Sequence, residues 1–262
     1  MTLVSDNHTI SVRQSEEGFH QILKFSYQKE WIFPSGTKSL YSFSRRVQIR
    51  YVGLREGIHK FQLGVIKSEF SLSRMADTTA ELSKSLHRAV GLLVLGADIH
   101  GNLVNIYNLP FVQHKWDELK KEFLQDYDRE EYLVLIREMD QRIANENTLV
   151  AYLQLPSMYG LYFNGYWEIK DVNKKPIQYG KELSEMHITE IQTYSTKRNE
   201  SQQETTIIAE LNSPNNDINI QHYKSTCTYV DGILDTCKKE IQIDSTKFYY
   251  SAKWVGLKKL FQ

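Results

Sequence analysis

The chain has 262 residues, of which 41% are hydrophobic and 24% charged. This composition is ordinary for a globular protein, and the length is enough for one large β-rich domain or two smaller ones. The 32 basic and 32 acidic residues cancel. The basic excess typical of nucleic-acid-binding proteins is therefore missing, and we expect no nucleic-acid partner.

The sequence predicts no segment that crosses a membrane. Its longest apolar run, residues 89–97, is far shorter than the roughly 20 residues that a spanning helix needs. The first residues lack the basic and then apolar pattern of a signal peptide. We therefore expect a cytoplasmic, soluble protein, and a homo-oligomer is compatible with the sequence.

Residues 19–70 alternate between apolar and polar positions, which predicts three antiparallel strands joined by turns. A further short strand is expected near residues 8–12. The middle strand carries three arginines, Arg45, Arg46 and Arg50. We interpret them, with Lys60 nearby, as a basic face. Such a face is either solvated or docks an acidic partner.

The central part of the chain changes to helical periodicity. Apolar residues at near-helical spacing predict a helix over residues 73–91, followed by a β-hairpin that turns at residues 100–102. Three more helices are expected, over residues 109–127, 128–143 and 145–154. Asp128 and Glu131 form a capping-box pattern at the start of the second of these three.

The C-terminal part again alternates, which predicts five strands. They cover residues 186–195, 204–211, 218–230, 233–243 and 248–254. Because strands and helices occupy separate parts of the sequence, we predict an α+β fold. It consists of a curved antiparallel β-sheet built from the N-terminal and C-terminal meanders and covered by a central helical block, about residues 72–155. We expect one domain over residues 1–262; the rival is a split into 1–155 and 156–262.

The two cysteines, Cys227 and Cys237, flank the hairpin signal Asp231-Gly232. A three-residue loop would place Cys227 opposite Cys237, and a two-residue turn would place it opposite Thr236. Either register brings the sulfurs near each other. We expect two free thiols in a reducing cytosol, whereas in an exported protein the pair would form a disulfide. A structural zinc site is disfavoured because it needs four ligands.

No catalytic motif is present in the sequence. It lacks the nucleophile motif GxSxG, the zinc-hydrolase motif HExxH and the phosphate-binding glycine motifs. The one close acid–histidine pair, Asp98 and His100, falls in a predicted turn, where these residue types serve the backbone. We therefore predict no catalytic, cofactor-binding or metal-binding residues and no enzyme activity.

The stretch PSMYGLYFNGYW, residues 156–167, is unusually aromatic. It contains Tyr159, Tyr162, Phe163, Tyr166 and Trp167. Aromatic residues with polar tips are enriched at interfaces and ligand clefts, and they also fill cores. Both interpretations stay open, and these five residues join Arg46 and Arg50 as candidates for partner binding.

Three functions fit these observations. The first is a non-enzymatic protein-interaction module, such as an adaptor, a secretion-type chaperone or an immunity-type inhibitor, which binds another protein by surface complementarity. The second is a carrier that holds a hydrophobic ligand in a half-barrel cleft, because a curved sheet covered by helices can enclose an apolar space. The third is an enzyme of unrecognised type. We favour the first.

Overall fold

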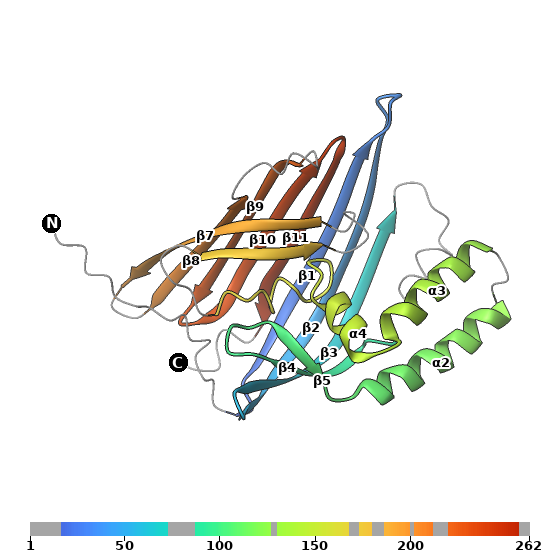
Figure 1. Ribbon diagram of the computed structural model, residues 1–262, viewed down its shortest axis with the longest axis horizontal. Helices are drawn as coiled ribbons and strands as arrows, with labels where there is room; N and C mark the ends of the chain where they lie inside the picture. The colour runs from blue at the N-terminus through green and yellow to red at the C-terminus, as the bar shows by residue number, and fades with distance from the viewer. Residues whose placement is uncertain are drawn as a thin grey trace.

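The computed structural model describes residues 17–72, 87–126, 130–167, 173–179, 186–199, 202–211 and 220–256. Their strands form one antiparallel sheet in the order β5-β4-β3-β2-β1-β11-β10-β9-β8-β7-β6 (Figure 1). In chain order the strands are β1 (His20–Ile32), β2 (Lys38–Arg55), β3 (Ile58–Leu72), β4 (Leu92–Ala97), β5 (Leu103–Ile106), β6 (Asn173–Tyr179), β7 (Met186–Arg198), β8 (Gln203–Leu211), β9 (Ile220–Val230), β10 (Ile233–Ile243) and β11 (Thr246–Gly256). The predicted α+β fold with a curved antiparallel sheet is confirmed.

The first and last described strands pair with each other and so join the two meanders. Along this pair Phe25 lies opposite Ala252, and Tyr27 lies opposite Tyr250. The rings of Tyr27 and Tyr250 stack with centroids 5.0 Å apart. The N-terminal and C-terminal strands thereby form a single sheet.

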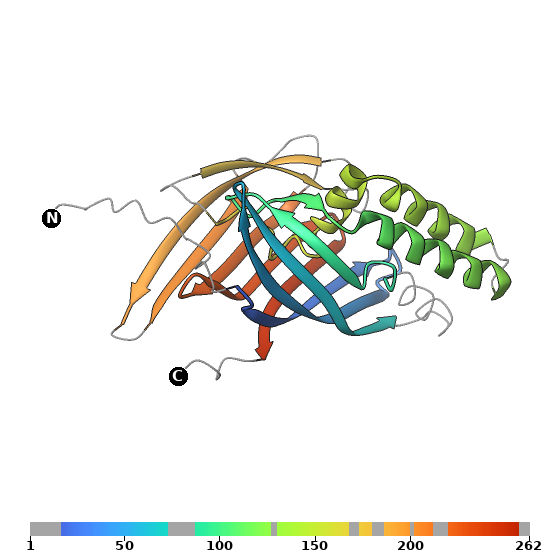
Figure 2. The ribbon, with the colours of Figure 1, turned by 90° about the horizontal axis from the view of Figure 1, so that it is seen from below.

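Three helices lie between the two meanders in the described part of the sequence. They are α2 (Leu109–Asp126), α3 (Glu130–Ile143) and α4 (Glu146–Leu153). Figures 1 and 2 show α2 and α3 side by side next to the β4–β5 edge of the sheet. None of the described helices combines the length and the hydropathy that crossing a bilayer requires.

Side chains at the helix starts and between helices explain this arrangement. Asn145 caps α4 in a capping box with Thr148, which satisfies backbone groups that the first helical turn leaves free. Glu146 then accepts a hydrogen bond of 2.7 Å from the backbone N–H of Ile106 and ties α4 to β5. The Nε1 of Trp116 in α2 donates to Asp140 in α3 at 2.7 Å.

Some of the predicted elements cannot be compared. The strand near residues 8–12, most of the helix over 73–91 and the capping residue Asp128 lie outside the described residues. Residues 87–90, at the end of that predicted helix, form turns. The alternation pattern also missed β6, which contains Pro176. This strand pairs only with β7, at the edge of the sheet, which is where a strand tolerates proline.

The hydrophobic core lies on the concave face of the sheet. Figure 2 shows the sheet curving, with the blue N-terminal strands on one side and the orange strands of the C-terminal half on the other. Leu23 and Phe25 of β1, Val47 of β2 and Phe61 and Leu63 of β3 are all buried on this face. These apolar residues alternate with more exposed residues along each strand, so one face of the strand packs in the core and the other faces solvent.

Candidate functional site

The chain after α4 folds into the concave face instead of forming a strand. We call residues 154–167 the aromatic segment; Figure 1 shows it in yellow, crossing the sheet. The ring of Tyr159 packs edge-on against Phe25 at 5.5 Å. Phe61 in turn contacts Tyr162 at 6.0 Å and Trp167 at 5.8 Å between ring centroids. The aromatic segment therefore fills much of the space inside the curved sheet.

Two glycines allow the aromatic segment to pack this closely. A Cβ atom at Gly160 would lie 1.9 Å from the carbonyl oxygen of Gln154, so only glycine fits there. Gly101, in the turn between β4 and β5, has a φ of +85° and lies directly against the Trp167 ring. The backbone N–H of Trp167 donates to the carbonyl of His100 at 3.1 Å. The turn thus fixes the end of the aromatic segment.

The predicted partner-binding aromatic residues all lie in this core. Tyr159 is fully buried, and even the most accessible of the five, Tyr162, is only 8% exposed. Of the two open interpretations, the structure therefore places these side chains as core packing. A partner could reach them only if the aromatic segment left the sheet.

The three arginines of β2 do not share a face. Arg46 and Arg50 are exposed on the convex side, as expected. Arg45 is 1% exposed and points into the concave core, so its assignment to the basic face was wrong. Successive residues of a strand point to opposite sides, and Arg45 occupies the same parity as Phe43 and Val47.

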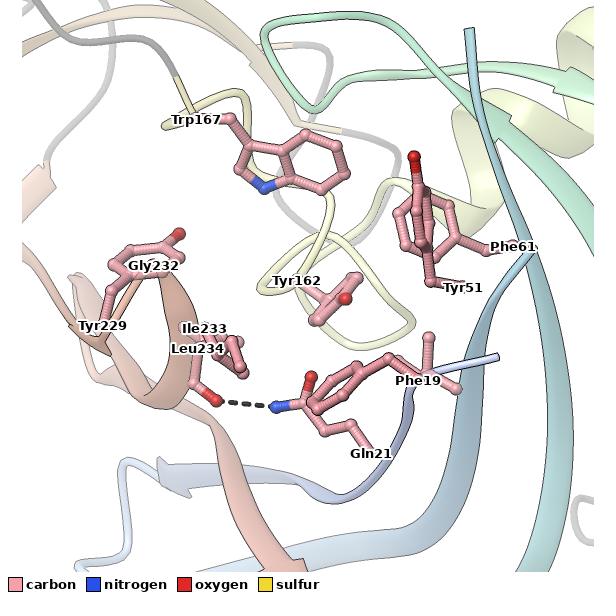
Figure 3. Close-up of a pocket in the computed structure, with 11 residues that line it drawn as sticks. Phe19, Gln21, Tyr51, Phe61, Tyr162, Trp167, Tyr229, Gly232, Ile233 and Leu234 are labelled. Carbon is pink, nitrogen blue, oxygen red and sulfur yellow. Dashed lines mark hydrogen bonds between the residues drawn. The ribbon is translucent and has the colours of Figure 1, made fainter. Parts of the chain in front are cut away.

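A small pocket lies between the aromatic segment and the sheet (Figure 3). Its walls are mainly apolar and aromatic and come from β1, β2, β3, the aromatic segment and the β9–β10 hairpin. The lining residues are Phe19, Gln21, Ile49, Tyr51, Phe61, Tyr162, Trp167, Tyr229, Gly232, Ile233 and Leu234. The pocket contains about 390 Å³ of space between atoms, including its open mouth, but leaves room for only about one water molecule.

One polar side chain in this pocket is not satisfied. The Nε2 of Gln21 donates to the carbonyl of Leu234 at 2.7 Å. Its Oε1 is buried without a hydrogen-bond partner and, in Figure 3, points toward the space beside Tyr162. A buried acceptor without a donor costs free energy. A bound water or a donor group of a ligand would remove that cost.

A second set of unsatisfied polar atoms surrounds Arg45. Its Nη2 donates to the carbonyl of Ser157 at 2.8 Å and contacts the sulfur of Met158 at 3.0 Å. Its Nε and Nη1 have no partner, and neither does the Tyr159 hydroxyl. The guanidinium lies 4.5 Å from the centroid of the Tyr159 ring. Burial raises the pKa of Tyr159, although the positive charge of Arg45 opposes that shift.

A third buried polar cluster, centred on Glu190 of β7, is fully satisfied. Its carboxylate accepts hydrogen bonds from Tyr166 at 2.7 Å, from Gln192 at 3.3 Å and from Tyr223. Lys239 completes the cluster with an ion pair of 3.3 Å. Burial, and then the charge of Glu190, raise the pKa of Tyr166 well above its ordinary value. This hydroxyl therefore stays protonated and holds the aromatic segment to the C-terminal strands.

The two cysteines also face the concave side and are buried. They lie directly opposite each other in β9 and β10 and form a disulfide. The hairpin combines the two registers considered from sequence. Val230 pairs with Ile233 around a two-residue turn, and a bulge between Leu234 and Thr236 then brings Cys227 opposite Cys237.

Two other sequence observations have simple structural explanations. Asp98 accepts hydrogen bonds from the backbone of His100 and Asn102, at 3.0 and 2.8 Å, as the turn interpretation requires. The described residues contain no group of three or more His, Cys, Asp or Glu side chains placed to hold a metal ion. Sequence reasoning missed Gln21 and Glu190 and assigned Arg45 to the wrong face, although a polar residue at an inward-facing strand position was a usable signal for Gln21 and Arg45.

Comparison with known proteins gives only distant structural likenesses. No protein-family model and no curated protein matches the chain. Lipovitellin, from a structure describing its lipid–protein interactions, is similar over 92% of this chain at 10% identity, with a TM-score of 0.47. DynF of the dynemicin biosynthesis pathway of Micromonospora chersina aligns over 94% of this chain and 86% of its own, at 5% identity and a TM-score of 0.22. The chain spans only 25% of the lipovitellin chain, and neither likeness assigns it to a family or a function.

Proposed function

We propose that this protein is a non-enzymatic carrier that binds a hydrophobic ligand on the concave face of its sheet, under the aromatic segment. The observation that carries the proposal is the pocket of Figure 3, which combines aromatic and apolar walls with the unpartnered amide oxygen of Gln21. Ligand sites typically pair an apolar lining with a few convergent polar groups.

The pocket must widen to admit such a ligand, because its present volume accommodates only about one water molecule. Tyr162 and Trp167 form the wall on the side of the aromatic segment. The opposite wall consists of strands held by continuous backbone pairing. Moving the aromatic segment should therefore cost less free energy than separating the paired strands, and it is the expected way to open the site.

The first test is binding of an apolar fluorescent dye, together with native mass spectrometry of the purified protein. We expect saturable dye binding by the wild type, and a small apolar molecule retained by part of the purified protein. Tyr162→Ala should bind more dye, because it removes one wall of the pocket and leaves a cavity. Tyr250→Ala is the matched control: it removes an equally buried tyrosine that does not line the pocket.

The proposal fails if neither the wild type nor Tyr162→Ala binds the dye saturably and the purified protein carries no ligand. Equal gains in dye binding for Tyr162→Ala and Tyr250→Ala would also contradict it. That result would mean that the dye reports loosened packing at any site and not this pocket.

Docking of an acidic protein on the convex face is the second candidate function. Four basic residues, Lys253, Lys24, Arg46 and Lys67, lie directly opposite one another across β11, β1, β2 and β3. Like charges at directly opposed positions destabilise a sheet. Glu69 forms an ion pair with Lys67 at 2.6 Å, which offsets only part of this charge. We call these four residues the basic row; it supports an interaction role better than the buried aromatic residues do.

A further inference from the structure

Arg45 is the least expected charged residue in the molecule. It is 1% exposed and lies on the concave face among aromatic rings. The guanidinium is 4.5 Å from the ring centroid of Tyr159 and 5.2 Å from that of Phe43. Burying a charge away from water is costly unless an opposite charge and hydrogen bonds compensate it.

The protein compensates Arg45 incompletely. One nitrogen, Nη2, donates to Ser157, and the aromatic rings contribute cation–π attraction. Nε and Nη1 remain without an acceptor, as does the adjacent Tyr159 hydroxyl. No carboxylate among the described residues forms an ion pair with the guanidinium. Two guanidinium nitrogens and one hydroxyl, which can donate or accept, therefore lie buried here without a hydrogen-bond partner.

We propose that the ligand of this carrier is a single-chain amphiphile with a carboxylate head group, and that the head group binds Arg45. The inference rests on the proposed function and adds the chemical class of the ligand. A carboxylate supplies one negative charge and several acceptor sites, which match one guanidinium and one hydroxyl. A phosphate dianion would leave excess negative charge in an apolar interior.

The register of the sheet indicates where the apolar chain of such a ligand would lie. Arg45 lies opposite Phe25, and Ile49 lies opposite Gln21, four residues along the same inward-facing row. At about 3.3 Å per residue the two positions are about 13 Å apart. The aromatic segment covers both, through Tyr159 at one end and Tyr162 at the other. A chain running along this row from Arg45 would reach the pocket of Figure 3 once the aromatic segment moves away from the sheet, as widening of the pocket already requires, and a water molecule beside the chain would donate to the Oε1 of Gln21.

The test compares two probes of equal chain length, dodecanoate and dodecanol, by displacement of the bound dye. We expect the wild-type protein to bind dodecanoate about tenfold more tightly than dodecanol, because charge-assisted hydrogen bonds to Arg45 form only with the acid. Arg45→Met should bind the acid as weakly as the alcohol and keep its affinity for the alcohol. Arg55→Met, an exposed arginine of the same strand, is the control and should keep the acid preference.

Each result has a separate meaning. Equal affinity of the wild type for the two probes would overturn the head-group inference and leave the carrier function intact; this is also the result expected if only a water molecule occupies the site. An acid preference that persists in Arg45→Met would equally overturn it. Binding of neither probe by a protein that does bind the dye would overturn the head-group inference alone, whereas absence of saturable dye binding and of a retained ligand overturns the carrier function. The wild-type comparison needs no variant, so it decides the matter even if Arg45→Met does not fold.

Discussion

Glu190 shows how a single buried residue can hold distant parts of this chain together. Its carboxylate is fully buried and bridges Tyr166 of the aromatic segment, Tyr223 of β9 and Lys239 of β10. In contrast to Arg45, every charge in this cluster has an opposite partner. The cluster therefore serves the stability of the fold, while the unsatisfied atoms of Arg45 and Gln21 are the ones on which the proposed ligand site depends.

We expect Glu190→Gln to destabilise the protein by about 3–5 kcal/mol, because it removes the buried negative charge to which Lys239, Tyr166 and Tyr223 bind. Urea denaturation followed by circular dichroism measures this change. The double variant Glu190→Gln/Lys239→Met should be less destabilised than Glu190→Gln, since it removes the buried cation together with the carboxylate that it pairs with. A loss below about 1 kcal/mol in the single variant would show that the ion pair contributes little.

In the β9–β10 hairpin, the pairing register decides whether the two cysteines lie opposite each other and can form a disulfide. Asp231 and Gly232 both have positive φ values, of 50° and 79°, which is the geometry of a tight two-residue hairpin turn. The turn alone would have placed Cys227 opposite Thr236. The bulge after Leu234 corrects the register by one residue and brings the two cysteines together.

Reduction of the disulfide should lower the free energy of unfolding by about 2–3 kcal/mol, as expected for opening a loop of about ten residues. The double variant Cys227→Ala/Cys237→Ala should behave like the reduced protein. Intact-mass measurement after thiol blocking under denaturing conditions tests the bond itself, since the oxidised protein takes up no blocking reagent. Two blocked thiols in protein purified without reductant would contradict the pairing.

Positive and negative charges are equal in number over the whole chain, but they are unevenly distributed over the surface. The formal net charge is zero, yet the basic row concentrates four cations on the convex side of four adjacent strands. The opposite, concave side is closed by the aromatic segment. The molecule therefore has two distinct faces: an apolar concave side packed against the aromatic segment and a convex side that carries the basic row.

If the basic row docks acidic proteins, Arg46→Glu should weaken binding of polyglutamate, used as a model acidic chain, by about threefold to tenfold at low salt. Wild-type binding should also fall as salt screens the charges. Lys121→Glu makes the same change in net charge on α2, away from the basic row, and should have little effect. An equal loss in both variants would mean that only the net charge matters.

Much of the fold was predictable because it depends on local patterns. The alternation in residues 40–52 and the apolar stripe that begins at Val112 and Trp116 of α2 specify strand and helix directly, and both are as predicted. The candidate site was not predictable in the same way. Its residues come from β1, β2, β3, the aromatic segment and the β9–β10 hairpin. No residue spacing in the sequence indicates that these elements meet.

The sequence by itself determined most of the strands and helices, the α+β fold class, and the meeting of the two cysteines in a hairpin. Hydrophobic periodicity and turn residues act over a few neighbouring positions, so these features can be predicted locally. Only the tertiary structure decided that β1 pairs with β11, that the aromatic segment fills the concave face, and that Arg45 and Gln21 are buried with unpaired polar atoms. Burial and hydrogen-bond satisfaction are properties of contacts between distant residues, and they exist only once the sheet has curved around the aromatic segment.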